Sequence, residues 1–277
     1  MAVLCAATAF TITAAAHFLN GRAKAEAQNG CIATIGWLVG AMDSSKTNPA
    51  TKSGADFRHI KTWIFDLDNT LYHADSNLFA QIESRMTEFI AHRLDVHPGE
   101  AYTLQHFYFR SYGSSLRGLM EWDHVDPEEF LSYVHNVDLS PLHPDPALRT
   151  ALQRLPGRRA IFTNGCRNHA MRVLEQIGLA GLWDDIWDIR TIGFIPKPKP
   201  EAYAKIVEVG GFDPHAAAMF EDTARNLVPA FNLGMTTVFI RNGSRWSLQG
   251  PEVAATPRQS FHHEIDDLGE FLQTIQL

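Results

Sequence analysis

The sequence predicts an α/β fold: a doubly wound, Rossmann-like parallel sheet with a helical cap domain inserted after the first strand. Three observations support this prediction. Short apolar, β-prone runs alternate with helical patterns through the second half of the chain, as in a parallel sheet covered on both faces. Polar residues follow several of these runs directly. A block of helical patterns over 75–140 separates the first strand from the next.

The expected elements follow from periodicity and from helix start and stop signals. The first strand is expected over 60–66, a short apolar run that ends in a carboxylate. The inserted block is expected to form helices over 77–95, 99–122 and 126–136. Beyond it the sequence predicts strands over 158–164, 186–193, 217–222 and 236–242, and helices over 169–178, 200–210, 224–234 and 266–275.

These elements predict the domain organisation. We expect a core over 58–74 and 141–277, a cap over 75–140, and an N-terminal extension over 1–57. Residues 1–19 of the extension carry no charge except at His17. Three interpretations remain open for it: translation that begins at Met42, a targeting segment, or a membrane anchor.

Composition excludes several classes of protein. The chain has 277 residues, with 24 Lys and Arg against 31 Asp and Glu, so the formal net charge is −7. An acidic balance with no basic run argues against nucleic-acid binding. Three cysteines are too few and too scattered for a disulfide framework or a zinc site. We expect a cytoplasmic protein with no membrane partner; the oligomeric state is left open.

Polar side chains gather where the predicted strands end. In an open parallel sheet, ligands bind outside the carboxyl ends of the strands, near the point where strand order reverses. Acids, a hydroxyl and a lysine should therefore meet at one edge of the sheet. The residues concerned are Asp66 and Asp68, Thr163 and Asn164, Lys197, and Glu221 with Asp222.

This group of residues suits phosphoryl chemistry. Asp66, Asp68 and Asp222 offer hard oxygen ligands, which favour Mg²⁺ over a softer metal. A carboxylate that faces a phosphoryl group can attack it in line and form an aspartyl-phosphate. Asp68 can supply a proton to the leaving alkoxide and then activate water. Lys197, Thr163 and the backbone N–H groups near Asn164 can hold the phosphate.

The motifs resemble those of the haloacid dehalogenase-like phosphatase superfamily. Asp66-Leu67-Asp68-Asn69-Thr70 matches its DxDxT signature, and three later motifs follow in the same order: Thr163-Asn164-Gly165, Lys197-Pro198-Lys199-Pro200, and Glu221-Asp222-Thr223. The resemblance covers about residues 58–245. It implies Asp66 as nucleophile and Asp68 as acid and base, with the Asp68 backbone carbonyl on Mg²⁺. It also implies that Asp222 completes the metal shell, with Glu221 as neighbour or alternate ligand.

Finer features resemble the pyrimidine 5′-nucleotidase-like branch of this superfamily. They include 66–72 (DLDNTLY), 112–120 (YGSSLRGLM) and 163–170 (TNGCRNHA). Members hydrolyse nucleoside monophosphates, so the resemblance implies such a small phosphorylated substrate, held in part by Asn164 and Gly165. A phosphatase of sugar phosphates, a phosphomutase and a nucleotide-sensing scaffold are the alternatives. A dehalogenase is disfavoured, because it has no use for an acid at Asp68.

The cap and the start of the helix after 164 contribute further candidate residues. Arg117 is a cap candidate that would read the leaving group, together with Arg110, Tyr112 and Ser115. One aromatic of 107–109 could stack on a base. His169 is expected to help begin a helix or to bond the backbone, with a ligand or substrate role as the alternative. Cys166 is expected to have no role, because no base is evident beside it.

Overall fold

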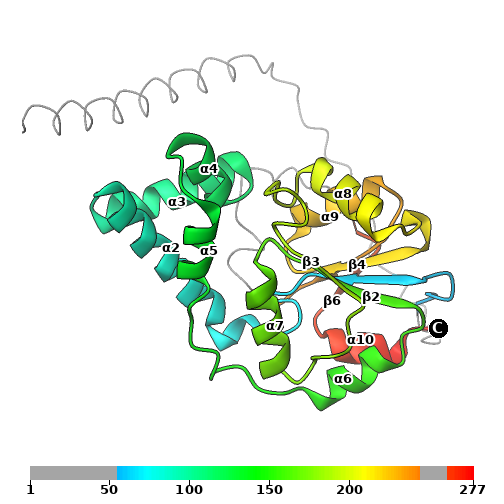
Figure 1. Ribbon diagram of the computed structural model, residues 1–277. Coiled ribbons are helices and arrows are strands. Elements are labelled where there is room, and N and C mark those ends of the chain that lie inside the picture. Colours follow the sequence, from blue (N-terminus) through cyan, green and yellow to red (C-terminus); the bar gives the residue numbers. More distant parts are fainter. Residues whose placement is uncertain (1–54, 244–260) are drawn as a thin grey trace, which may run out of the picture. The chain divides into compact units, whose positions relative to one another are not determined.

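Six parallel strands form one sheet in the computed structural model, which describes residues 55–243 and 261–277 (Figure 1). The strand order is β3-β2-β1-β4-β5-β6. The first strand lies in the middle, and successive strands are added first on one side of it and then on the other. The predicted doubly wound parallel core is confirmed. The strands are β1 (Thr62–Phe65), β2 (Arg158–Phe162), β3 (Asp185–Trp187), β4 (Ala217–Glu221), β5 (Thr236–Ile240) and β6 (His263–Ile265).

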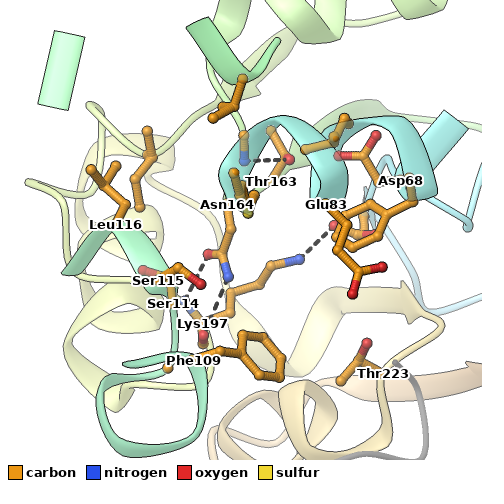
Figure 2. A pocket seen from close by; sticks show the side chains of 18 of the residues that line it. Asp68, Glu83, Phe109, Ser114, Ser115, Leu116, Thr163, Asn164, Lys197 and Thr223 are labelled. Atoms are coloured by element: carbon orange, nitrogen blue, oxygen red, sulfur yellow. Dashed lines mark hydrogen bonds and ion pairs between the residues drawn. The ribbon is translucent and has the colours of Figure 1, made fainter. Parts of the chain in front are cut away.

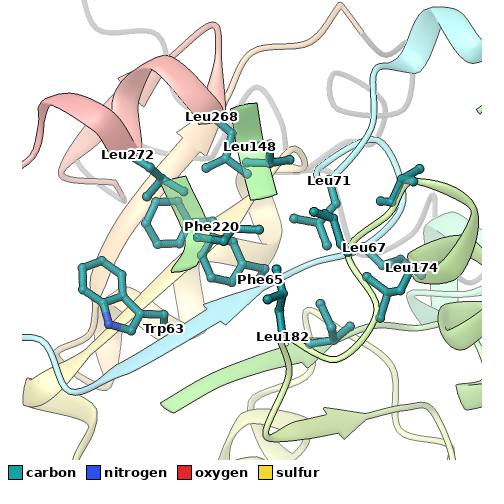
Figure 3. Packing of buried hydrophobic residues seen from close by; sticks show 14 of the residues in the cluster. Trp63, Phe65, Leu67, Leu71, Leu148, Leu174, Leu182, Phe220, Leu268 and Leu272 are labelled. Atoms are coloured by element: carbon teal, nitrogen blue, oxygen red, sulfur yellow. The ribbon is translucent and has the colours of Figure 1, made fainter. Parts of the chain in front are cut away.

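Apolar residues on both faces of β1 explain why this strand is central. Trp63 and Phe65 point to one face, where Phe65 stacks on Phe220 of β4 with ring centroids 4.6 Å apart (Figure 3). Ile64 points to the opposite face and belongs to the second hydrophobic cluster. All three side chains are fully buried, and each contributes roughly 1.5–3 kcal/mol by leaving water.

Helices cover both faces of the sheet. Figure 1 shows α6, α7 and α10 on one face and α8 and α9 on the other. Leucines of α6 and α10 (Leu148, Leu272) join Phe65 in the first cluster, whereas Tyr203 of α8 and Leu227 of α9 join Ile64 in the second. The core helices are α6 (Pro146–Gln153), α7 (Arg167–Gln176), α8 (Pro200–Gly210), α9 (Ala224–Asn232) and α10 (Leu268–Thr274), with a 3-10 turn, η2 (Pro214–Ala216).

A helical cap is inserted between β1 and β2, as predicted. Its helices pack on one another through Phe89, Tyr108, Leu119 and Phe130, which extend the second hydrophobic cluster. The edge-to-face contact of Phe89 with Phe130, at 5.2 Å between centroids, joins two of them. The cap comprises η1 (Ala74–Ser76), α2 (Leu78–Leu94), α3 (Pro98–Tyr112), α4 (Ser115–Trp122) and α5 (Pro127–Val134).

The single helix predicted over 99–122 is wrong: it is two helices. Gly113 has φ 87°, a left-handed conformation that ends α3. Ser114 then caps α4, because its side-chain oxygen accepts a hydrogen bond from the Arg117 backbone N–H at 3.1 Å. The turn faces the core: a Cβ at Gly113 would lie 3.4 Å from the Lys197 carbonyl oxygen.

Other expected boundaries also differ. The strand predicted over 186–193 ends early, because the Asp188 carboxylate accepts hydrogen bonds from Thr191 and the Arg167 backbone N–H and holds a turn there. Neither α6 nor β6 was predicted. Helix α6 does carry a local signal, since Asp145 caps it and Pro146 occupies its first turn.

The predicted extension lies outside the described residues up to position 54. Within its last three residues, Phe57 is fully buried and stacks on Trp63 at 5.7 Å. The start at Met42, the targeting segment and the membrane anchor all concern residues that the structure does not describe. Across 55–243 and 261–277, no helix has the length and apolar character needed to cross a membrane.

Candidate active site

The predicted polar residues meet at the carboxyl ends of β1, β2 and β4. They line a cavity of about 150 Å³ that the cap also borders. The parallel register brings them together: Phe65 pairs with Ile161 of β2 and with Phe220 of β4, so the three strands end level. The core side of the cavity contains Asp66, Asp68, Thr163, Asn164, Gly165, Lys197, Glu221 and Asp222.

Lys197 is the electrostatic centre of this site. Its Nζ donates to Asp66 Oδ1 at 2.7 Å, to Glu221 Oε2 at 2.7 Å and to the Phe162 carbonyl oxygen at 2.9 Å. Only 1% of Lys197 is exposed. Three acceptors satisfy the three donors of the ammonium group, as a buried lysine requires. Figure 2 shows Lys197 between Phe109 and Ser114 on one side and Asp68 and Thr223 on the other.

The buried acids outnumber the buried cation. Asp66, Glu221 and Asp222 are each less than 7% exposed, and Lys197 is the basic side chain among them. Burial and the nearby Glu221 charge raise the pKa of Asp66 to about 7, although Lys197 opposes the shift. Burial and the charges of Glu221 and Asp66 raise the pKa of Asp222 well above its usual value. These three acids therefore exceed the one lysine that contacts two of them, and the other buried cation of the cavity wall, Arg225, lies against Phe109 instead.

A divalent cation fits this deficit. One carboxylate oxygen from each of Asp66, Glu221 and Asp222 lies within 4.8 Å of the others, so the three can hold a metal ion. Three ionised carboxylates and one ammonium sum to a charge of −2, which one divalent ion would balance. Hard carboxylate oxygens suit Mg²⁺ or a similar cation.

The two acids at the end of β4 have different partners. Glu221 accepts the Lys197 ammonium on Oε2 and the Thr223 backbone N–H on Oε1 at 3.1 Å. Asp222 accepts longer hydrogen bonds of 3.4 Å, from Thr223 Oγ1 and Asn242 Nδ2. Short bonds to an ammonium and a backbone N–H hold Glu221 more firmly than the longer bonds hold Asp222. This difference favours Asp222 as the metal ligand and Glu221 as the partner of the lysine.

Asp68 sits in a separate hydrogen-bond network. Its Oδ1 accepts from Tyr72 Oη at 2.7 Å and lies 2.9 Å from His169 Nε2. Burial alone would raise the pKa of Asp68. The charge and hydrogen bond of His169, with the hydrogen bond from Tyr72, outweigh burial and lower that pKa below its usual value. Without a metal ion, Asp66 is thus the carboxyl group that keeps its proton to higher pH, and Asp68 is the one that ionises more readily.

His169 contacts Asp68, a role that the sequence analysis did not assign to it. His169 lies on the first turn of α7, and its ring stacks on His135 at 4.4 Å between centroids. His135 in turn lies 3.1 Å from Cys166 Sγ, so the expectation that Cys166 has no base beside it is wrong. His135 comes from the end of α5, 31 residues before Cys166, and local sequence reasoning could not pair them.

The motif that follows β2, Thr163-Asn164-Gly165, holds the loop that contains Lys197. Asn164 Oδ1 accepts the Lys197 backbone N–H at 2.8 Å, and its Nδ2 donates to the Lys197 carbonyl oxygen at 3.3 Å. Thr163 Oγ1 accepts the Gly165 backbone N–H at 2.9 Å. A Cβ at Gly165 would lie 3.2 Å from Thr163 Oγ1, so glycine keeps this turn open. Asn164 thus positions Lys197 as well as bordering the cavity.

The cap contributes a mainly apolar wall. Phe109 is the aromatic of 107–109 that borders the cavity, and the guanidinium of Arg225 lies 4.2 Å from its ring centroid. Arg117 is not brought to the cavity: it pairs with Glu121 at 3.6 Å on α4. Of the other three cap candidates, Ser115 lines the cavity, and Arg110 and Tyr112 do not.

The fold and the site together define an α/β protein with a carboxylate and lysine centre at the strand switch point. A family model described as haloacid dehalogenase-like hydrolase matches residues 60–234. The chain belongs to this hydrolase family, which confirms the superfamily resemblance. Phosphate metabolism protein 8 of Saccharomyces cerevisiae is 31% identical over 194 residues, which is 63% of this chain and 60% of the yeast protein. The match thus spans less than two thirds of that relative.

Solved structures share the fold at low sequence identity. A HAD phosphatase from Thermococcus onnurineus superposes with a TM-score of 0.52 at 20% identity, covering 77% of this chain and 97% of that one. A haloacid dehalogenase-like hydrolase from Streptococcus pneumoniae has a TM-score of 0.50 at 17% identity, covering 78% and 98%. These likenesses concern the fold alone.

Proposed function

We propose that the protein is a Mg²⁺-dependent phosphomonoesterase that works through an aspartyl-phosphate on Asp66. The observation that carries this proposal is the buried group of Asp66, Glu221 and Asp222 around Lys197. It combines a nucleophilic carboxylate with a charge deficit that a divalent cation and a phosphate group would complete. Asp66 and Asp222 would hold the metal, with the Asp68 backbone carbonyl. When bound, Mg²⁺ supplies positive charge that favours ionised Asp66 and offsets the phosphoryl oxygens.

The remaining residues divide the reaction between them. Asp66 attacks the phosphorus, and the bond to the leaving oxygen breaks. Asp68, which is ionised at rest because of its lowered pKa, takes up a proton and passes it to the leaving alkoxide, and later accepts one from the water that hydrolyses the acyl phosphate. Lys197 and Thr163 neutralise and orient the phosphoryl oxygens. The cap excludes water during the first step.

For the substrate, we propose a nucleoside monophosphate, and a pyrimidine nucleotide in particular. Phe109, Leu116 and Met86 give the cap side of the cavity apolar surface that suits a planar base. The motifs of the nucleotidase-like branch support the same substrate. A sugar phosphate is the second candidate, because Ser114 and Ser115 also border the cavity. We place the reaction in the cytoplasm.

Phosphate release from a panel of esters, measured with Mg²⁺ and with EDTA, tests this function. We expect UMP and CMP to be hydrolysed faster than AMP, GMP and sugar phosphates, and EDTA to abolish release. Restored activity on adding excess Mg²⁺ is the control for chelator damage. Activity on sugar phosphates alone would keep the mechanism and discard the nucleotide. Release that persists fully in EDTA would contradict the metal requirement.

His169 should position Asp68 for proton transfer. His169→Leu removes the Nε2 contact and fills the buried position with an apolar side chain. We expect kcat to fall about tenfold and KM to change by less than about threefold. His169→Gln can place a donor near the same point and should recover part of the loss. Steady-state phosphate release measures both variants, and thermal melting checks their folding. An equal loss of kcat in both would argue against positioning.

A further inference from the structure

One acidic side chain of the cap faces the cavity without a part in the proposed chemistry. Glu83, on α2, lines the cavity and is 4% exposed. Among the described residues, it is the one Asp, Glu, Lys or Arg that the cap contributes to the cavity wall. Figure 2 shows it on the same side as Asp68 and Thr223, across from Ser114 and Ser115.

Glu83 has contacts on the cap side through both its side chain and its backbone. His106 Nε2 lies 3.5 Å from Glu83 Oε1, and His106 does not line the cavity. The Glu83 backbone carbonyl oxygen accepts from Thr87 Oγ1 at 3.2 Å and from Gln105 Nε2 at 3.4 Å. Glu83 thus has a partner in the cap, His106, and also borders the cavity, which Arg225 of α9 lines from the core.

The neighbouring polar groups are engaged within the cap. Ser115 Oγ donates to the Gln105 backbone carbonyl oxygen at 3.0 Å, and Thr87 Oγ1 donates to Gln105 Oε1 at 2.5 Å. Ile82, Met86 and Leu116 supply apolar surface to the same wall. In such a setting a carboxylate interacts strongly with what it faces, because water screens it poorly.

We propose that Glu83 forms a leaving-group subsite that accepts hydrogen bonds from a neutral leaving group with hydroxyl or N–H donors. The same carboxylate repels substrates that carry a second anionic group on the leaving group. This inference rests on the proposed phosphomonoesterase function. It adds the chemical class of the leaving group, which the core residues do not determine because they contact the phosphate.

Aryl phosphates that differ at one position test the charge selection. Wild-type protein should prefer phenyl phosphate over 4-carboxyphenyl phosphate by about tenfold or more in kcat/KM. Glu83→Gln should reduce that preference to about twofold and leave phenyl phosphate within about threefold of wild type. Glu88→Gln is the matched control, since Glu88 is exposed on the same helix. Glu83→Asp keeps the charge and should keep the preference.

Nucleotide analogues identify the donor. CMP compared with its 2′-deoxy form tests a sugar hydroxyl, and CMP compared with its N4,N4-dimethyl form tests the base N–H. Loss of the donor that Glu83 binds should lower the wild-type kcat/KM about tenfold and should have little effect in Glu83→Gln.

The outcomes separate this inference from the function on which it rests. Wild-type release from phenyl phosphate with an unchanged charge preference in Glu83→Gln would overturn the subsite and leave the phosphatase standing. Equal wild-type rates for CMP and both analogues would overturn it too. No release from any ester, by folded Mg²⁺-loaded protein, would overturn the function and this inference with it.

Discussion

Phosphate release should fall at least about a thousandfold when Asp66 is replaced by Asn, because the amide keeps the size of the side chain and lacks its nucleophilic charge. The ratio of the residual rates for two substrates with different leaving groups should differ from the ratio that the wild-type protein shows. Steady-state release from CMP and from phenyl phosphate measures the effect. Binding should survive, since Lys197 and Thr163 remain to hold the phosphate.

Two comparisons make the Asp66→Asn result decisive. Asp95→Asn is the matched control, because Asp95 is exposed at the end of α2 with φ 51°, a backbone conformation that asparagine tolerates. It should retain wild-type activity. A loss of less than about tenfold in Asp66→Asn would mean that another group carries the reaction.

Lys197→Met should lower both activity and stability. Without the ammonium, Asp66 and Glu221 lose their 2.7 Å partner and become uncompensated buried acids. We expect the metal-free protein to lose about 3 kcal/mol of unfolding free energy, and kcat/KM to fall at least about a hundredfold. Denaturant titration in EDTA and phosphate release with Mg²⁺ measure the two effects.

Lys199→Met is the matched control for that variant. Lys199 lies two positions along the same loop, but it is exposed. Its replacement should change the unfolding free energy by less than about 0.5 kcal/mol and leave kcat/KM near wild type. If both lysine variants behaved alike, the loss would reflect loop damage rather than the buried ion pairs.

The sequence predicted the core of the fold well, for a physical reason. Central parallel strands are buried on both faces, so β1 and β4 appear as continuous apolar runs bounded by polar residues. The sequence therefore shows where these strands end. Because ligands bind at the carboxyl ends of parallel strands, near the point where strand order reverses, Asp66 and Asp222 were expected to lie together. Spacing alone thus located the acids that the structure brings within 4.8 Å with Glu221.

Features that depend on distant contacts were not predictable in the same way. The break at Gly113 fits against the Lys197 loop, and α3 and α4 otherwise share one helical pattern. His169 reaches Asp68, 101 residues earlier in the chain. Arg117 was expected to read the leaving group, yet the acidic Glu83 is the charged cap residue at the cavity. Short β6 pairs through its backbone with β5, which leaves little trace in its side chains.

Trapping the phosphoryl group on Asp66 tests whether the reaction passes through an aspartyl-phosphate. Protein is mixed with CMP and Mg²⁺, quenched within its first turnovers, reduced with borohydride, and cut after Lys61 and Arg85 for mass analysis. Reduction converts a phosphorylated aspartate to homoserine and leaves free aspartates intact. We expect homoserine at position 66, dependent on substrate and absent from Asp66→Asn. Rapid phosphate release with only aspartate at position 66, or homoserine at position 68 instead, would contradict it.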